Sequence, residues 1–304
     1  MARAASRGAH HSAAREERLV AIERSGSAAE LLARAGDYLT LQEAESNLLL
    51  GILSDLQRGG SFGAEQPYLA CLRSGREVIG VALRTPPFGV VLSEMRSVAV
   101  ADLFADDVSK LFQSIPTVLG PVEVAKRFAR RWEAVTRQRG KIARHERIYK
   151  CEWVIPPSTS AGSMRAVRES ERSTVVQWML AFHSEAMPGF PQSEADVESA
   201  IDRRLAADHG GLVFWEDGGE PVALAASGGR TPNGIRIGPV YTPSEKRRRG
   251  YATALVAGLT AKLLERVKFC FLFTDLANPT SNGIYGKIGY VPVTDVDLIA
   301  FKQH

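Results

Sequence analysis

The segment of the sequence best suited to chemistry is a run of arginines followed by small residues. Residues 247–252 read Arg-Arg-Arg-Gly-Tyr-Ala and stand between an expected strand and an amphipathic helix expected over 250–267. Free N–H groups and the positive end of the dipole at a helix start attract phosphates, and Gly250 and Ala252 let a ligand approach closely. A solvated basic turn is the alternative interpretation. The residues expected to form a pyrophosphate site here are Arg247, Arg248, Arg249, Gly250, Tyr251 and Ala252.

A second polar pattern follows a buried strand expected over 269–274. Asn278 precedes Pro279, an arrangement typical of a helix N-terminus. Asn282 and Tyr285 lie four and seven residues after Asn278, so all three share one face of a short helix expected over 280–288.

Pro239 lies inside the strand expected over 235–241. Because proline cannot donate to a ladder, the strand must bulge or separate from a neighbour there. The backbone N–H of Val240 or Tyr241 then becomes free to donate to an extended ligand. An edge-strand proline without consequence is the alternative.

These features occupy the second of two similar halves. Each half is expected to contain strands forming a meander, then a helix, a strand, a second helix and a final strand, so we interpret the chain as a tandem repeat of one α+β fold. The boundaries that we expect are a disordered tail over 1–16, a first domain over 17–155, a linker over 156–163 and a second domain over 164–304.

The arginine-rich loop and the segment from Asn278 to Tyr290 together resemble the two signatures of the GCN5-related N-acetyltransferases (GNATs), over about 164–301. The first half has the order of elements but no Arg-x-x-Gly-x-Gly/Ala loop between Val91 and Val108. The resemblance therefore implies two tandem GNAT-like domains, each a mixed, mostly antiparallel sheet flanked by helices. The first domain would be degenerate and lack the cofactor loop.

The resemblance also implies an activity, the transfer of an acetyl group from acetyl-CoA to a primary amine in a ternary complex. The Val240 N–H would polarise the thioester carbonyl, and Tyr285 would protonate the departing thiolate. Asn278 and Asn282 would hold the pantetheine arm. Acetyl-CoA is the expected co-substrate and no metal is expected.

The general base is the least determined residue, since the strand over 235–241 carries no carboxylate. The candidates are Asp275, Glu185 and His183, each with a structural role as its alternative. Cys270 stands between two phenylalanines, which favours a core position over a nucleophilic one.

Two functions from other classes stay open. Residues 126–150 contain ten basic residues against two acidic ones, a possible nucleic-acid patch. However, the spacing of Phe128 and Trp132 suits a core-facing helix better than a stacking platform. The second alternative is an acyl-CoA-binding sensor or regulatory protein without turnover.

Composition sets the outer limits. The chain has 304 residues, 45% of them hydrophobic, with a formal net charge of +4, which suits an anionic ligand without requiring nucleic acid. No apolar run is long enough to cross a bilayer, so we expect no membrane partner.

Three separated cysteines indicate neither disulfides nor zinc, and a cytoplasmic location follows as the default. A transit peptide is the alternative for the tail. The partner would be a small-molecule or peptide amine, and the chain a monomer or a dimer.

Overall fold

The computed structural model describes residues 20–158, 160–186, 192–205 and 211–303. The expected tail over 1–16 lies outside these residues. The two halves repeat one order of elements, strand, two helices, three strands, helix, strand, helix and strand. The first half consists of β1 (Val20–Arg24), α1 (Ala28–Leu41), α2 (Asn47–Gln57), β2 (Tyr68–Ser74), β3 (Glu77–Arg84), β4 (Val90–Leu92), α3 (Val100–Ser109), β5 (Thr117–Pro121), α4 (Val122–Val135) and β6 (Gln138–Cys151).

The second half has the same succession, with short 3₁₀ turns at Glu169–Glu171 and Ser244–Lys246. It consists of β7 (Ser163–Ala166), α5 (Arg172–Ala186), α6 (Glu194–Leu205), β8 (Gly211–Asp217), β9 (Glu220–Gly228), β10 (Gly234–Tyr241), α7 (Tyr251–Leu264), β11 (Phe269–Asp275), α8 (Pro279–Lys287) and β12 (Val291–Gln303). The α+β tandem architecture expected from the sequence is confirmed.

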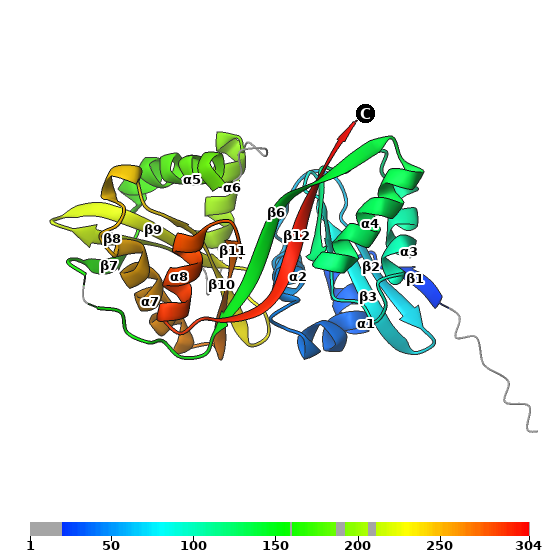
Figure 1. The fold of residues 1–304 in the computed structure, drawn as a ribbon, viewed down its shortest axis with the longest axis horizontal. Coiled ribbons are helices and arrows are strands. Elements are labelled where there is room, and N and C mark those ends of the chain that lie inside the picture. Colours follow the sequence, from blue (N-terminus) through cyan, green and yellow to red (C-terminus); the bar gives the residue numbers. More distant parts are fainter. Residues whose placement is uncertain (1–19, 159, 187–191, 206–210, 304) are drawn as a thin grey trace, which may run out of the picture.

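The halves exchange their last strands. The described strands form one sheet in the order β1-β2-β3-β4-β5-β12-β6-β11-β10-β9-β8-β7. β12 of the second half pairs antiparallel with β5 and β6, while β6 of the first half pairs antiparallel with β11 (Figure 1). The long strands β6 and β12 pair with each other along almost their whole length, and their backbone hydrogen bonds hold the two halves together.

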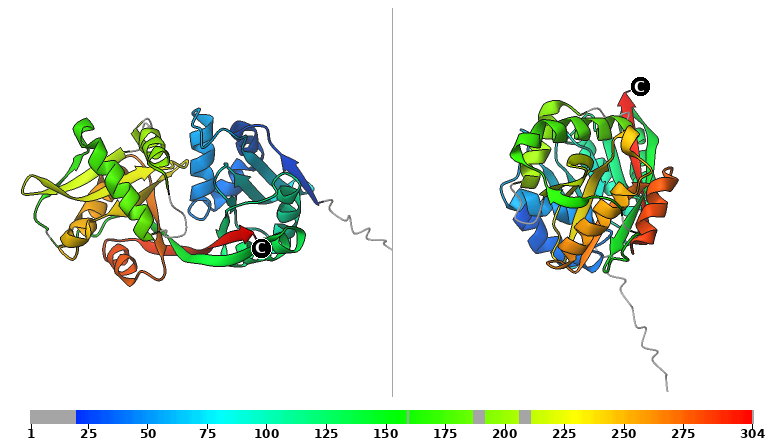
Figure 2. Two further views of the ribbon diagram at one scale, coloured as in Figure 1. Left: turned by 90° about the horizontal axis from the view of Figure 1, so that it is seen from above. Right: turned by 90° about the vertical axis from the view of Figure 1, so that its left-hand side faces the viewer.

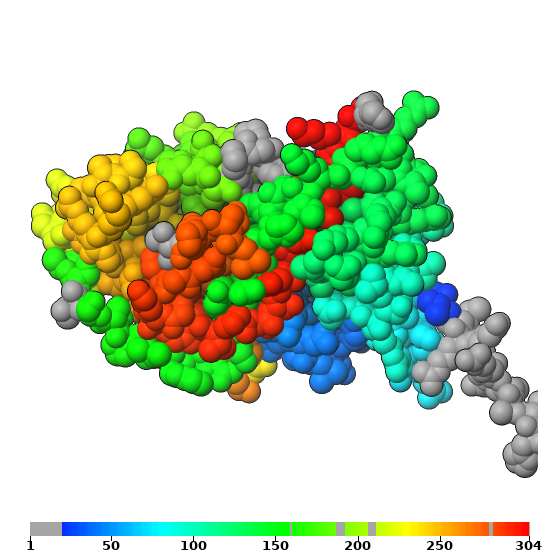
Figure 3. All heavy atoms as spheres, viewed as in Figure 1, coloured from blue at the N-terminus to red at the C-terminus, as the bar shows by residue number. Residues whose placement is uncertain are grey.

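Four apolar clusters attach the helices to this sheet. The clusters beneath α3 and α4 and beneath α7 lie on one face, and Tyr285 of α8 and Ile288 just after it join the latter. The clusters beneath α1 and α2 and beneath α5 and α6 lie on the other face (Figure 2, left). Alternation along the strands requires this two-sided burial. The space-filling view in Figure 3 shows the outer surfaces of α4, α7 and α8 on the first of these faces.

The sequence prediction needs corrections at the strand exchange. Local patterns in the sequence predict a helix from Glu123 to about Arg139 and a strand around 148–154, but α4 ends at Val135 and β6 begins at Gln138. The same patterns predict separate strands near Tyr290 and Leu298, where the structure has the single strand β12. Local sequence patterns do not show that β6 and β12 extend each other, because their partners lie about 150 residues apart in the chain.

The basic stretch 126–150 divides between α4 and β6. Phe128 and Trp132 are fully buried and their rings stack at 6.1 Å, which confirms the core interpretation of this pair. Six of the ten basic side chains form ion pairs with carboxylates, so little free charge is left for a nucleic acid. The paired residues are Lys126, Arg127, Arg131, Arg144, Arg147 and Lys150.

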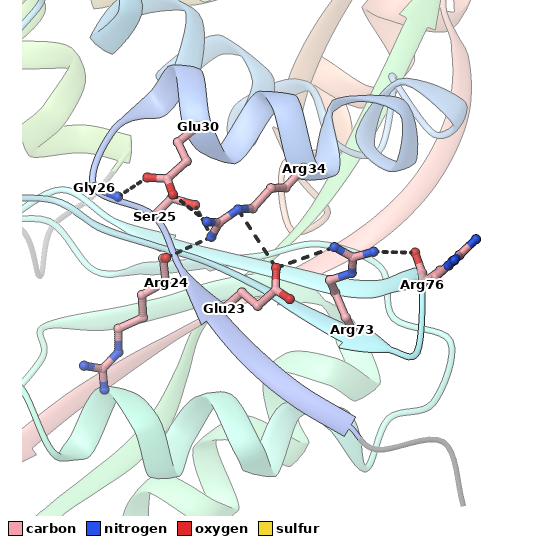
Figure 4. A network of polar contacts seen from close by, with 8 residues as sticks. All are labelled: Glu23, Arg24, Ser25, Gly26, Glu30, Arg34, Arg73 and Arg76. Carbon is pink, nitrogen blue, oxygen red and sulfur yellow. Dashed lines mark hydrogen bonds and ion pairs between the residues drawn. The ribbon is translucent and has the colours of Figure 1, made fainter. Parts of the chain in front are cut away.

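The outer end of the first half is tied together by a polar network that joins β1, α1 and β2 (Figure 4). Arg34 donates to Glu30 at 2.5 Å and to the carbonyl of Arg24 at 3.0 Å. Glu23 lies 3.7 Å from Arg73, whose Nη2 donates to the Arg76 carbonyl. The network fixes an edge strand that has a neighbour on only one side.

Candidate functional site

The strands β10 and β11 separate at the centre of the second half. Their parallel pairing covers only Gly234–Arg236, although β10 continues to Tyr241 and β11 to Asp275. On its other side β10 has a register irregularity between Ile237 and Val240. The separation expected at Pro239 is confirmed. Because successive strand residues direct their N–H groups to opposite neighbours, one of the Val240 and Tyr241 amides faces β9 and the other faces the open side.

The loop after β10 leads into a helix start with free amides. Gly250 has φ +83°, a left-handed conformation that favours glycine, and it immediately precedes α7. The first intrahelical bond runs from the Ala254 N–H to the Gly250 carbonyl at 3.0 Å. The amides of Tyr251, Ala252 and Thr253 therefore precede the helical ladder and can donate to an anion.

The three loop arginines have different roles. Arg247 donates from Nε to the Thr242 carbonyl at 2.8 Å and from Nη2 to Glu185 at 2.6 Å, and it lies over the Tyr241 ring. Arg248 and Arg249 are exposed and form no ion pair with any described residue. Arg247 thus positions the loop against α5, whereas the other two are available to a phosphate.

Tyr251 anchors the beginning of α7. Its ring is buried and its hydroxyl donates to Asp217 in the β8–β9 hairpin at 2.5 Å. Lys246 reaches Glu220 in the same hairpin at 3.0 Å. The Tyr251 side chain is therefore occupied, and its backbone N–H is the group that can meet a ligand.

The polar residues of α8 mainly hold the turn that follows β11. The Asn282 side chain accepts a hydrogen bond from the Thr274 hydroxyl and donates to the Asp275 carbonyl at 3.1 Å. The Asn278 carbonyl accepts from the Asn282 N–H at 3.2 Å. The Asp275 carboxylate accepts from the Ala277 amide at 2.8 Å. Both Asn282 and Asp275 are thus committed to positioning α8.

Tyr285 lies half-buried where α8 packs against the core. Its ring meets that of Tyr290 edge-on at 5.9 Å, and the Tyr290 hydroxyl is hydrogen-bonded to Thr260 at 2.8 Å. Burial raises the pKa of Tyr285 to about 12. The phenol is therefore protonated near neutral pH and can donate a proton.

The three candidate bases have unequal surroundings. The Glu185 carboxylate accepts hydrogen bonds from the Tyr241 hydroxyl at 3.1 Å and from Arg247, so both of its oxygens already have a donor. Asp275 is held by the backbone of its own turn. His183 of α5 has a buried Nδ1 without a hydrogen-bond partner in the described part of the chain. Burial, with the nearby charges of Arg204 and Arg144, lowers the pKa of His183, so its imidazole is neutral at pH 7.

Several polar residues near the separated strands were missed from the sequence. Arg144 donates to the Ala186 carbonyl at 2.9 Å and pairs with the buried Glu146, whose pKa burial raises. Arg236 alternates with the buried Ile235 and Ile237 along β10. An arginine between two isoleucines of a buried strand is unusual, and this pattern could have singled out Arg236 in the sequence.

A histidine–carboxylate pair lies on the opposite face of the sheet. His145 Nδ1 is 2.6 Å from Asp297, a fully buried residue of β12. His145 alternates with Glu146 and so shares the face of Tyr149, beneath α7 and α8. The pair arises from the register of β6 and β12, which the sequence does not reveal.

The equivalent turn of the first half follows β4. There the amides of Val100, Ala101 and Asp102 donate to the carbonyls of Ser97, Val98 and Ala99. A cavity of about 530 Å³ beside the turn is lined by Glu94 and Glu123, together with Arg147 and residues 292–295 of β12. Bonded amides and the carboxylates of Glu94, Glu123 and Asp295 make this turn unsuited to a pyrophosphate.

None of the described helices has the length and apolar character needed to span a bilayer. The three cysteines, Cys71, Cys151 and Cys270, are buried and unbridged. Cys270 is fully buried and burial raises its thiol pKa, so its expected core position is confirmed.

Comparison with known proteins agrees with this architecture. A family model described as FR47-like protein matches residues 216–296, which contain both the arginine loop and α8. No curated protein matches the chain.

Solved structures of similar fold match both halves. A Drosophila protein superposes with a TM-score of 0.63 at 14% identity, covering 93% of this chain and 98% of its own. A GCN5-related N-acetyltransferase from Sphaerobacter thermophilus gives 0.58 at 17% identity, covering 93% and 95%. A tandem GNAT protein from the clavulanic acid biosynthesis pathway gives 0.56 at 10% identity, covering 94% and 98%. At these identities the likeness establishes the fold.

Proposed function

We propose that this chain, which has the tandem fold of the GCN5-related N-acetyltransferases, transfers an acetyl group from acetyl-CoA to a primary amine. One observation carries the proposal, namely that the gap between β10 and β11 is followed by a helix start with free amides. Such a gap accommodates an extended arm, and the amides can bind a diphosphate at the arm's end. The division into domains over 17–155 and 164–304 is part of the same proposal.

The residues proposed to bind the co-substrate follow from this geometry. The amides of Tyr251, Ala252 and Thr253 would hold the diphosphate, with Arg248 and Arg249 supplying counter-charge. Arg247 would act indirectly, by holding the loop through Glu185. Asn278 stays a proposed contact of the pantetheine arm. Asn282 is not retained in that role, because its side chain is occupied within the turn after β11.

In this proposal the chemistry proceeds by direct attack in a ternary complex. Acetyl-CoA supplies an activated acyl group as a thioester. The open-side amide, from Val240 or Tyr241, donates to the carbonyl oxygen as negative charge develops on it. His183 accepts the proton from the attacking amine, and Tyr285 donates one to the departing thiolate. No covalent enzyme intermediate is formed.

Calorimetry with acetyl-CoA tests the proposal. The variant Arg248→Glu/Gly250→Glu places two carboxylates at the helix start, and we expect it to abolish detectable binding. Arg96→Glu is the matched control, because Arg96 is exposed in the equivalent turn of the first half. Equal affinity in the double variant and the wild type would refute the phosphate-loop assignment. Binding without acetylation of any amine in a panel would favour the sensor alternative.

A further inference from the structure

Two arginines near the separated strands have no carboxylate partner among the described residues. Arg204, at the end of α6, donates to the Ala200 carbonyl at 3.0 Å and reaches the Gly238 carbonyl at 3.5 Å. Arg236 of β10 donates to the side-chain oxygen of Asn47 at 3.3 Å. Among the described residues, neither guanidinium lies within 4.0 Å of an acidic side chain. The nearby Asp55 pairs instead with Arg58 at 2.6 Å.

Both residues of this cationic pair are half-buried. The Nε atom of Arg204 is buried and has no hydrogen-bond partner in the described part of the chain. Burial and the charge of Arg236 lower the pKa of Arg204 to about 10, and burial also lowers that of Arg236. The charge of Asp55 acts on both guanidinium groups, but its carboxylate is paired with Arg58, so the two cations are a favourable place for an additional anion.

The backbone around the two arginines leaves room for their head groups. A Cβ atom on Gly229 would lie only 2.7 Å from Nη2 of Arg236, and the stem of Arg204 lies against Gly228. The residues Gly228 and Gly229 follow one another at the end of β9, so both guanidinium groups approach the same part of the sheet.

This location is next to the reacting end of the proposed site. Gly238, whose carbonyl Arg204 approaches, lies in the irregular segment just before Val240. His183 is close enough to Arg204 for the guanidinium charge to lower the imidazole pKa. An anion held here would therefore lie beside the proposed base and the proposed thioester carbonyl.

We propose that Arg204 and Arg236 bind an anionic group, a carboxylate or a phosphate, carried by the acceptor amine. The inference rests on the proposed acetyl transfer and adds the chemical class of its acceptor. Bidentate guanidinium–oxyanion bonds would orient the acceptor so that its amine faces His183.

Calorimetry without acetyl-CoA, using three matched amines, tests the inference. The probes are tyramine, tyramine phosphate and 4-(2-aminoethyl)benzoate. All three carry a primary amine on a phenylethyl group, and they differ in the para substituent, which is a neutral hydroxyl, a phosphate or a carboxylate. We expect at least one anionic probe to bind about 10- to 100-fold more tightly than tyramine. The phosphate and carboxylate arms show which oxyanion is preferred.

Variants assign the effect to the two arginines. Arg204→Gln and Arg236→Gln should each remove most of the preference for the anion, and Arg236→Lys serves as a charge-conserving variant should Arg236→Gln fail to fold. Arg172→Gln is the control, because Arg172 pairs with Asp202 at the surface. Equal affinity of the three probes in the wild type would overturn the inference. So would an anion preference that survives undiminished in folded Arg204→Gln and Arg236→Gln. If Arg236→Gln does not fold, Arg236→Lys should bind the anionic probes more weakly than the wild type, because lysine cannot form the bidentate bonds of a guanidinium, and an unchanged affinity would overturn the inference.

A separate acetyl-CoA titration distinguishes the two levels of proposal. If acetyl-CoA binds and amines are acetylated without preference for an anion, the acceptor class is wrong and the transferase function stands. If the anionic probes bind through the arginines but acetyl-CoA does not, the transferase function is wrong and the anion site stands.

Discussion

The turns after β4 and β10 occupy equivalent places in the two halves but offer opposite surfaces to an anion. After β10, a glycine with positive φ precedes a helix whose first amides have no helical acceptor. After β4, the corresponding amides are bonded within the turn, and Glu94 and Glu123 line the adjacent cavity. The same fold therefore presents a helix start with free amides in one half and an acidic recess in the other. The difference lies in a few turn residues and not in the arrangement of strands.

The largest kinetic effect should come from Tyr285→Phe, because Tyr285 of the second half is the proposed donor of a proton to the thiolate. Loss of a general acid typically costs about 10²- to 10⁴-fold, so we expect kcat to fall within that range while acetyl-CoA affinity stays unchanged. Steady-state kinetics and calorimetry together separate the two quantities.

Tyr38→Phe is the control for that variant, since the Tyr38 hydroxyl donates to the Glu94 carbonyl beside the first-half turn. It should leave kcat unaltered. If Tyr285→Phe retains wild-type kcat, protonation of the thiolate belongs to solvent and α8 has only a cofactor-binding or structural role.

His183→Gln should produce the next largest effect, about 10²-fold in kcat/KM at pH 7. The pKa of His183 is lowered below the usual 6.5. The neutral imidazole is therefore present at pH 6.5 and above, and it is lost as the pH falls through the lowered pKa. The wild-type profile of kcat/KM should therefore fall on the acidic side below about pH 6.5.

The pH profile of His183→Gln should lack that acidic fall. His145→Gln, on the opposite face of the sheet and paired with Asp297, should retain it. If the acidic fall disappears only in His145→Gln, the base is His145, on the face covered by α7 and α8. That result would contradict the proposal that His183 accepts the proton of the amine.

The comparison also shows what sequence alone could predict. The arginine loop, the separation at Pro239 and the helix at Asn278 depend on residues close together in the chain, and each was predictable from local backbone chemistry. The exchange of β6 and β12 depends on pairing between segments about 150 residues apart, which local patterns do not encode.

The distribution of polar contacts was equally hidden. Glu185, Asp275 and Asn282 have residue types suited to catalysis or binding, but the fold commits them to Arg247, to a turn amide and to Thr274. His183 and Arg204 differ from them, because Nδ1 of His183 and Nε of Arg204 are buried and have no hydrogen-bond partner in the described part of the chain. A sequence gives the functional groups available, whereas only packing decides which of them are left free.

Arg248→Ala should have a modest effect. Arg248 is exposed, so solvent screens its attraction for a phosphate, and we expect acetyl-CoA affinity to fall about 2- to 5-fold. The loss should be smaller at high salt, which calorimetry at two ionic strengths would show. Arg96→Ala in the first half should change neither quantity. A loss of 100-fold in Arg248→Ala would mean that side-chain charge, and not the amides of α7, dominates phosphate binding.

The smallest expected effect is the most direct test of why the halves differ. Glu94→Gln/Glu123→Gln removes two of the three carboxylates that line the first-half cavity and leaves only Asp295, which is paired with Arg147. The amides of Val100, Ala101 and Asp102 stay bonded within their turn. If backbone geometry decides, calorimetry should still give one acetyl-CoA per chain with unchanged affinity, because no free donors have been created. A second equivalent of bound acetyl-CoA would instead show that charge repulsion alone keeps the first half empty. The bonded turn after β4 would then be able to open for a diphosphate, and the contrast between the two helix starts would be electrostatic in origin.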